Sequence, residues 1–163
     1  MLTRRFLVIG GGCLIAARNT SWLVAAADAA GGAAVTHSDA EWRELLTAAQ
    51  YAVVRQHSTE LPFSSPLLNE HRAGIFACAG CGRDLFSSET KFESGTGWPS
   101  FWAPVHNGAV GTSRDTSLGE VRTEVHCASC GGHLGHVFDD GPPVTGLRYC
   151  MNGVAMTFKP AAA

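Results

Sequence analysis

The sequence lacks an excess of charge of either sign. Its 163 residues hold 12 Lys and Arg against 14 Asp and Glu, and charged residues make up only 16% of the chain. From Thr36 onward there is no run of like charges. A protein that binds nucleic acid or an anionic membrane surface through electrostatics carries a basic patch. We therefore expect no nucleic acid among its partners.

Long hydrophobic runs are also missing. The apolar stretch from Phe6 to Ala17 is shorter than the roughly 18 residues that a membrane-spanning helix requires, so we expect no stable membrane insertion. The stretch follows Arg4-Arg5 and precedes an alanine-rich tail, which is the three-part layout of an export signal. We expect residues 1–30 to be this signal and to be removed.

The arginine pair supports a more specific prediction. "TRRFLV" resembles a twin-arginine signal, although the usual residue between the arginines and the Phe-Leu is missing. We predict export to the periplasm by the twin-arginine route, and an ordinary secretory signal with a basic start is the alternative. Residues 31–37 are then a small-residue linker, and residues 38–160 form one domain.

No long internal repeat follows the signal, and the body begins with a helical pattern. Ser38 and Glu41 have the spacing of a capping box. We predict one helix over residues 38–58. Its apolar face is formed by Trp42, Leu45, Leu46, Ala49 and Val53.

From Gly74 onward the pattern changes to short apolar or alternating segments separated by Gly, Asp, Pro or Ser. These segments are "GIFACAG", "DLFSS", "TSLGEVRTEVHC", "GHVFDD" and "GLRYCMNGVAMTFKP". Such pieces are typical of antiparallel strands. The sequence therefore predicts a mainly β domain with a helical N-terminal arm.

Cysteines are few, but their spacing is informative. With Cys13 in the predicted signal, the mature chain keeps Cys78, Cys81, Cys127, Cys130 and Cys150. The first four form two CxxC pairs, and the glycine after each pair lets the backbone turn tightly and aim both thiols at one centre. We predict a structural zinc site of four thiolates that joins the two halves of the β body. Two disulfides or a redox-active pair are the alternatives.

The fifth cysteine lies in a predicted strand, "GLRYCMNG". A period of two places Leu147, Tyr149 and Met151 on one face, and Arg148, Cys150 and Asn152 on the other. The guanidinium favours a thiolate and lowers the cysteine pKa, while the amide can hydrogen-bond beside the reacting sulfur. This face favours a nucleophile, although a lone cysteine in a strand is often a small buried residue.

"HLGHVFDDG" supplies a candidate acid or base. His133 and His136 are three residues apart, so in an extended strand they face opposite sides and only one meets Cys150. The spacing does not decide which one does. A hydrogen-bonded structural histidine is the alternative for each.

Taken together, the motifs resemble a known family. "CAGCGRDLFSS", "KFESGTGWPSFW", "VRTEVHCASCGGHLGHVFDDGP" and "GLRYCMN" occur in the order found in methionine-R-sulfoxide reductases of the B type (MsrB). The resemblance covers Trp42 to Pro160. It implies two small antiparallel sheets, one structural zinc on the CxxC pairs, and reduction of the R epimer of methionine sulfoxide, protein-bound or free. The site residues that it implies are the nucleophile Cys150 with Trp98, His136 and Asn152, and, as further candidates, His133 and Arg148.

The substrate's chemistry fits these residues. Methionine sulfoxide has an apolar methyl group and one strongly accepting oxygen, so Trp98, extended by Phe138, can form an aromatic wall. The Cys150 thiolate attacks sulfur while a protonated His136, or water held by His133 or Asn152, protonates the oxygen. The products are methionine and a cysteine sulfenic acid.

One position departs from the family pattern. Many members carry a recycling cysteine two residues before the tryptophan, where this chain has Thr96. We therefore predict a single-catalytic-cysteine cycle in a monomer, with an external thiol or thioredoxin-like protein as the reductant. The rival classes are an exported zinc-ribbon module that binds without catalysis and a disulfide-stapled binding domain without metal.

Overall fold

The structure is a computed structural model that describes residues 35–162. The predicted export signal lies outside these residues. Within the predicted linker, the Val35 backbone N–H donates to the Ser129 carbonyl oxygen at 2.8 Å, and the Val35 side chain packs against the core. Contact with the folded body therefore begins at the first described residue.

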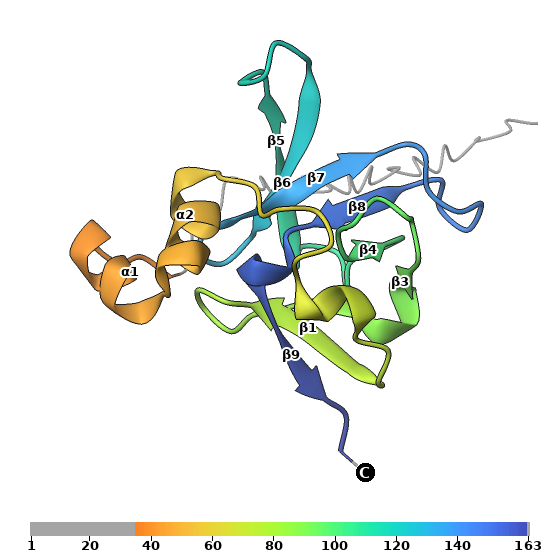
Figure 1. The fold of residues 1–163 in the computed structure, drawn as a ribbon, viewed down its shortest axis with the longest axis horizontal. Helices are drawn as coiled ribbons and strands as arrows, with labels where there is room; N and C mark the ends of the chain where they lie inside the picture. Colours follow the sequence, from red (N-terminus) through yellow and green to blue (C-terminus); the bar gives the residue numbers. More distant parts are fainter. Residues whose placement is uncertain (1–34, 163) are drawn as a thin grey trace, which may run out of the picture. The chain divides into compact units, whose positions relative to one another are not determined.

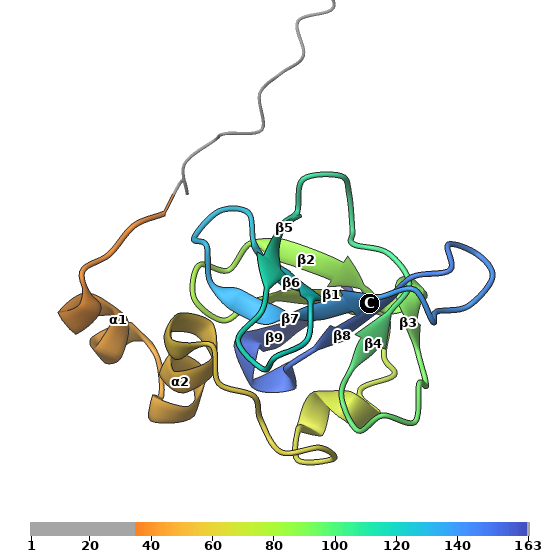
Figure 2. The same ribbon diagram turned by 90° about the horizontal axis from the view of Figure 1, so that it is seen from above.

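The N-terminal arm consists of two helices rather than the single helix predicted over residues 38–58. α1 spans Asp39–Leu45 and α2 spans Ala48–Gln56. Leu46 takes extended dihedral angles, and Thr47 then begins α2 with a capping box of its own, paired with Gln50. The prediction of one apolar face was wrong because of this break, which leaves Leu45 58% exposed. Figure 2 shows both helices on the same side of the strands.

The body contains two antiparallel sheets, which confirms the predicted mainly β fold (Figure 1). The smaller sheet has the strand order β2 (Asp84–Ser87), β1 (Gly74–Cys78) and β9 (Met156–Pro160). The order in the larger sheet is β3 (Lys91–Phe92), β4 (Ser100–Phe101), β8 (Arg148–Met151), β7 (His133–Phe138), β6 (Arg122–Cys127) and β5 (Val110–Asp115). Strands that are distant in sequence, such as β4 and β8, thus become neighbours in the larger sheet.

The sequence pattern missed or merged some of these elements. It gave no strand for β3, β4 or β5. It also treated residues 146–160 as one segment, whereas β8 and β9 belong to different sheets and are separated by the short 3-10 helix η3 (Gly153–Ala155). Two further 3-10 helices, η1 (Pro66–Asn69) and η2 (Ser88–Thr90), lie in the connections.

Three phenylalanines join the sheets at the core. Phe101 of the larger sheet stacks on Phe86 with ring centroids 4.5 Å apart, and it contacts Phe76 edge-on at 5.0 Å; all three are fully buried. Burial of each ring contributes about 1.5 to 3 kcal/mol, and each aromatic pair adds about 0.5 to 1.5 kcal/mol. This contact fixes β4 of the larger sheet against the smaller one. Within residues 35–162, helices are too short or too polar to cross a membrane.

Candidate active site

Cys150 occupies the middle of the larger sheet. Its strand, β8, pairs with β4 on one side and β7 on the other, and the Cα register places Ser100 and His136 directly opposite Cys150. The β7 backbone approaches closely at Gly135, where any Cβ atom would overlap the Cys150 carbonyl oxygen. The predicted nucleophile and one predicted histidine are therefore brought together by strand pairing.

A cavity of about 130 Å³ opens at this point of the sheet. Its lining residues are Thr59, Trp98, Arg122, Gly135, His136, Phe138, Cys150 and Asn152. The predicted residues Trp98, His136, Phe138 and Asn152 thus share one cavity with the Cys150 thiol. The other two candidates, His133 and Arg148, lie beside the cavity and do not line it.

Trp98 is presented to the cavity by a tight turn. Gly97 has a φ of 93°, a left-handed conformation that glycine adopts without strain. The Trp98 indole Nε1–H donates to the Glu60 carbonyl oxygen at 3.2 Å. This bond and the turn fix the position of the ring, which lines the cavity. Phe101, three residues further along the chain, is buried in the core.

Burial raises the pKa of the Cys150 thiol above its ordinary value. Hydrogen bonding from Thr96 and the charge of Arg148 oppose this effect, while the Asp140 carboxylate adds to it. Arg148 has the predicted influence, but its guanidinium is bound by both Asp140 oxygens at 2.8 Å, and burial outweighs it.

The position without the recycling cysteine lies next to the Cys150 thiol. The Thr96 hydroxyl oxygen is 3.9 Å from the Cys150 sulfur. Thr96 also shares a hydrogen bond with the Ser94 hydroxyl at 2.8 Å, and Ser94 shares another with Ser100 at 2.8 Å. A chain of three hydroxyl groups therefore lies beside the Cys150 sulfur.

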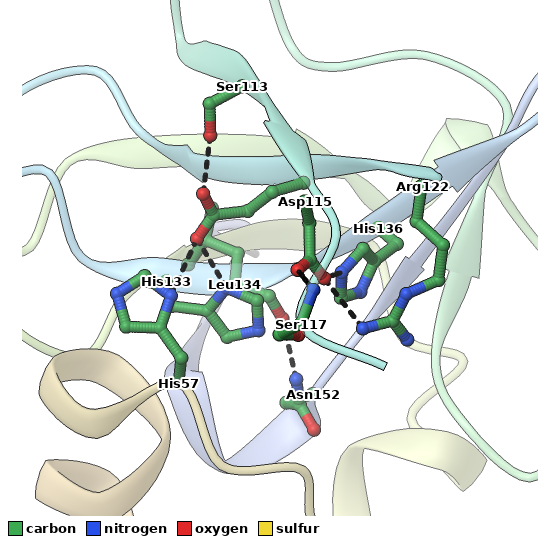
Figure 3. A network of polar contacts seen from close by, with 10 residues as sticks. His57, Ser113, Asp115, Ser117, Arg122, His133, Leu134, His136 and Asn152 are labelled. Atoms are coloured by element: carbon green, nitrogen blue, oxygen red, sulfur yellow. Dashed lines mark hydrogen bonds and ion pairs between the residues drawn. The ribbon is translucent and has the colours of Figure 1, made fainter. Parts of the chain in front are cut away.

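The strand period predicted that His133 and His136 face opposite sides of β7, and this prediction was wrong. Their ring centroids lie 5.5 Å apart. The β6–β7 register shifts between Val125 and His126: Val125 pairs with Gly135, whereas the next residue, His126, pairs with His133. This bulge inserts one extra residue into β7 and changes the alternation of its side chains. Both rings therefore point to the same face (Figure 3).

Each histidine has its own carboxylate. His136 Nε2 lies 2.7 Å from Asp115 Oδ2, and His133 Nδ1 lies 2.7 Å from Glu124 Oε1. His133 is 2% exposed, and burial lowers the pKa of its imidazole. Because His136 borders the cavity and His133 does not, the geometry favours His136 as the group that can exchange a proton there.

Asn152 is buried, and its side-chain amide bonds to two backbone groups of the protein. Its side-chain Nδ2 donates to the Leu134 carbonyl oxygen at 3.0 Å, and its Oδ1 accepts from the Glu60 backbone N–H at 3.0 Å. The Glu60 carboxylate in turn accepts from the Gly153 and Val154 backbone N–H groups. These bonds tie the segment after Cys150 to the loop before η1 and to β7.

Sequence reasoning missed four residues of this region: Thr59, Glu60, Asp115 and Arg122. Arg122 binds Asp115 through Nη2 at 2.6 Å, so this pair supports the His136 side of the cavity (Figure 3). Thr59 and Glu60 lie in a turn-rich segment whose pattern carries no chemical signal. The alternation of "VRTEVHC" indicates that Arg122 lies on a polar face of β6. It does not indicate that β5 brings Asp115 next to this face.

The four cysteines of the CxxC pairs form a cluster that can hold a metal ion, with their sulfur atoms all within 4.8 Å of one another. The Cys78 and Cys130 sulfurs are 3.6 Å apart, and those of Cys81 and Cys127 are 3.5 Å apart. A disulfide requires about 2.05 Å, so the two-disulfide alternative is wrong for these residues. Tetrahedral zinc with Zn–S bonds of about 2.3 Å places its sulfur ligands ~3.8 Å apart, and the cluster fits this geometry.

The backbone turn at each CxxC pair agrees with the predicted role of the glycines. Gly82 and Gly131 follow the two pairs with φ values of 73° and 66°, and their N–H groups donate to the Cys78 and Cys127 carbonyl oxygens. Cys78 ends β1 and Cys127 ends β6. An ion at the cluster would therefore join the smaller sheet to the larger one.

This fold and site define a class of protein, a mainly β domain in which one cysteine thiol borders a cavity and four other cysteines form a cluster that can hold a metal ion. Comparison with known families makes the class specific. A model of the SelR domain matches residues 46–160, and the chain belongs to this family of MsrB-type oxidoreductases.

Curated relatives agree over most of the chain. The peptide methionine sulfoxide reductase MsrB of Agrobacterium fabrum is 57% identical over 126 residues, which cover 77% of this chain and 93% of that protein. The MsrB proteins of Methanosarcina barkeri and Leptospira interrogans are 53% and 51% identical, again over 77% of this chain and over 89% and 95% of their own lengths. These relatives are reductases, so the alternative of a non-catalytic zinc-ribbon module is not favoured.

Proposed function

We propose that the chain reduces the R epimer of methionine sulfoxide to methionine, with Cys150 as the nucleophile. The observation that carries this proposal is the cavity that joins the Cys150 thiol to His136 and to the rings of Trp98 and Phe138. An apolar methyl group fits an aromatic wall, and an accepting oxygen needs a proton donor. The cavity offers both beside a single thiol.

The chemical step removes the sulfoxide oxygen. The Cys150 thiolate attacks the sulfoxide sulfur and forms a bond to it, and the S–O bond breaks as the oxygen takes up two protons and leaves as water. Water then attacks the Cys150 sulfur, the bond to the substrate sulfur breaks with its electron pair to release methionine, and Cys150 is left as a sulfenic acid. The cysteine loses two electrons and the sulfoxide gains two. His136 is the proposed proton donor, because His133 lies outside the cavity and the Asn152 amide is already bonded to Leu134 and Glu60.

An external thiol reductant completes the cycle. The other cysteines of residues 35–162 all belong to the metal cluster, and Thr96 holds the position beside the Cys150 sulfur. Two thiols of a small molecule or a thioredoxin-like protein would reduce the sulfenic acid to a thiol, releasing water and forming their own disulfide. We propose that the monomer is active, on free or protein-bound substrate, since residues of a single chain already bring the Cys150 thiol, the His136 imidazole and the aromatic rings to one cavity.

We also propose that the cysteine cluster binds one structural zinc ion per chain. Four thiolates in tetrahedral geometry form a closed site, which supplies stability rather than a reacting position. Cys78, Cys81, Cys127 and Cys130 would hold the ion, and the sulfur separations of 3.5 and 3.6 Å support this assignment.

Export of the folded protein would protect such a cluster. Thiolates must be reduced to hold zinc, whereas the periplasm oxidises cysteines. We therefore propose export by the twin-arginine route, which carries folded cargo, directed by Arg4-Arg5. Replacing both arginines by lysine should block transport. Undiminished export through the general secretory channel would contradict the proposal.

The direct test of the reaction is an assay with separated R and S epimers of methionine sulfoxide and dithiothreitol as the reductant. The chain should reduce the R epimer and leave the S epimer unchanged. Cys150→Ser should abolish the activity, because no other thiol lines the cavity among the described residues. Equal reduction of both epimers, or activity of Cys150→Ser, would refute the proposed function.

A further inference from the structure

A second cluster of metal-ligating side chains lies beside the cavity, separate from the four cysteines. His57, Glu124 and His133 each direct one ligand atom to a common point, and these atoms lie within 4.8 Å of one another. His57 Nδ1 is 3.0 Å and His133 Nδ1 is 2.7 Å from the same Glu124 oxygen, Oε1. Figure 3 shows the two imidazole rings next to each other.

The three residues are held by three different elements. His57 is the C-cap of α2 in a left-handed conformation, Glu124 lies on β6, and His133 begins β7. The second oxygen of Glu124 accepts a hydrogen bond from the Ser113 hydroxyl, which fixes the direction of the carboxylate. The His57 and His133 rings are 4.9 Å apart. The ligand atoms are therefore arranged by the fold.

This donor set suits a divalent transition-metal ion. Two imidazole nitrogens and one carboxylate oxygen are a known set for zinc sites that leave a position open for water. Zn–N and Zn–O bonds of about 2.0 to 2.2 Å need ligand atoms roughly 3.3 Å apart. The side chain of His57 is 60% exposed and can move to this spacing, while the buried pair of His133 and Glu124, now 2.7 Å apart, would have to open by about 0.6 Å to admit the ion.

An ion can also reach the cluster from solvent. All three residues line an open groove of about 630 Å³ next to the cavity. The same groove contains Arg114 and Arg122, whose charges oppose a cation. The charge of Arg122 is offset by Asp115 at 2.6 Å, and the Glu124 carboxylate supplies a negative charge at the ligand point itself.

We propose that His57, Glu124 and His133 form a second metal site that binds a divalent transition-metal ion, with water at the open position. The ion would connect the C-terminal end of α2 to β6 and β7. It would also hold the His133 ring, which contacts His136 at the cavity. This site does not depend on the proposed reaction, because its ligands are assembled whether or not Cys150 is the nucleophile.

Calorimetric titration with zinc tests the proposal on the full chain with its cysteine cluster already loaded. The Cys150→Ser background prevents the added zinc from binding the catalytic thiol. We expect one further equivalent of zinc in this background. Adding His57→Asn, which keeps a residue type that tolerates a positive φ, should weaken this binding at least 10-fold. Adding Glu124→Gln should do the same.

His71→Asn is the matched control, since His71 is also exposed but lies outside the cluster. It should leave the additional equivalent unchanged. The same zinc addition should raise the unfolding temperature of the Cys150→Ser protein and of the His71→Asn control, but not that of His57→Asn. Absence of a further equivalent, or equal loss of binding in His57→Asn and His71→Asn, would overturn the second site.

Discussion

Asp115 Oδ2 lies 2.7 Å from His136 Nε2, so a carboxylate on β5 orients the imidazole of His136. His136 on β7 is paired directly with Cys150 on β8. The same oxygen accepts a bond from Arg122. Contact with Ser117, His136 and Arg122 holds the pKa of Asp115 well below its usual range, which keeps the carboxylate charged beside the ring. Asp115 is therefore a positioning residue for the proposed proton donor.

Asp115→Asn should lower the rate of R-sulfoxide reduction by about 10-fold or more, because the ring loses the charge that anchors it. Single-turnover kinetics would measure the change. Asp84→Asn is a suitable control, since Asp84 pairs with Lys159 on the smaller sheet. Equal rates for the unmodified protein and Asp115→Asn would contradict the positioning role of Asp115.

The raised pKa of Cys150 predicts the pH dependence of the first step. A thiol with a raised pKa is mostly protonated at neutral pH, and its thiolate fraction grows as the pH rises, so alkylation of Cys150 should accelerate toward alkaline pH. Arg148→Ala should move this profile to higher pH and slow alkylation at neutral pH by roughly 3- to 10-fold, because the guanidinium is one of the groups that lower the pKa. Arg72→Ala, which removes a surface guanidinium paired with Glu70, should leave the profile in place.

Loss of one ligand of the cysteine cluster should destabilise the whole body, since the proposed zinc ion joins both sheets. Cys127→Ser should lower the free energy of unfolding by more than about 4 kcal/mol. Metal analysis of the purified parent should give one zinc per chain at this cluster, and strong chelators should lower its unfolding temperature. A parent protein that unfolds at the same temperature with and without chelator contradicts a structural ion.

Asn152→Ala should reduce stability by about 1 to 3 kcal/mol, because the partly buried Glu60 N–H loses its acceptor. Urea unfolding measures this cost, and Asn107→Ala at an exposed position provides a comparison. If Asn152→Ala abolished activity without any loss of stability, the amide would instead have a direct role toward the substrate.

Local patterns in the sequence predicted the parts of the site that depend on neighbouring residues. The CxxC spacing and its glycines predicted the metal cluster, and a period of two placed Arg148 beside the Cys150 thiol. What the patterns missed depends on pairing between distant segments. The bulge that turns His133 and His136 to one face arises from the β6–β7 register, and Glu60 reaches Trp98 and Asn152 through the tertiary fold.

The split of the predicted helix is a different kind of error, since its signal was present. Thr47 and Gln50 repeat the capping-box spacing of Ser38 and Glu41. The apolar periodicity hid this second start. The strand pattern also could not predict the direction in which the Cys150 pKa shifts. Burial and Asp140 raise this pKa against the effect of Arg148, and neither can be recognised from the pattern.

The most direct test of the single-cysteine account is mass spectrometry after one equivalent of methionine-R-sulfoxide, with a dione reagent that labels sulfenic acids. The parent should carry the label on Cys150 and form no intramolecular disulfide. Thr96→Cys, which places a thiol beside the Cys150 sulfur, should form a disulfide between residues 96 and 150 under the same conditions. A disulfide from Cys150 to any other cysteine of the parent, or a label on a different residue, would contradict the account.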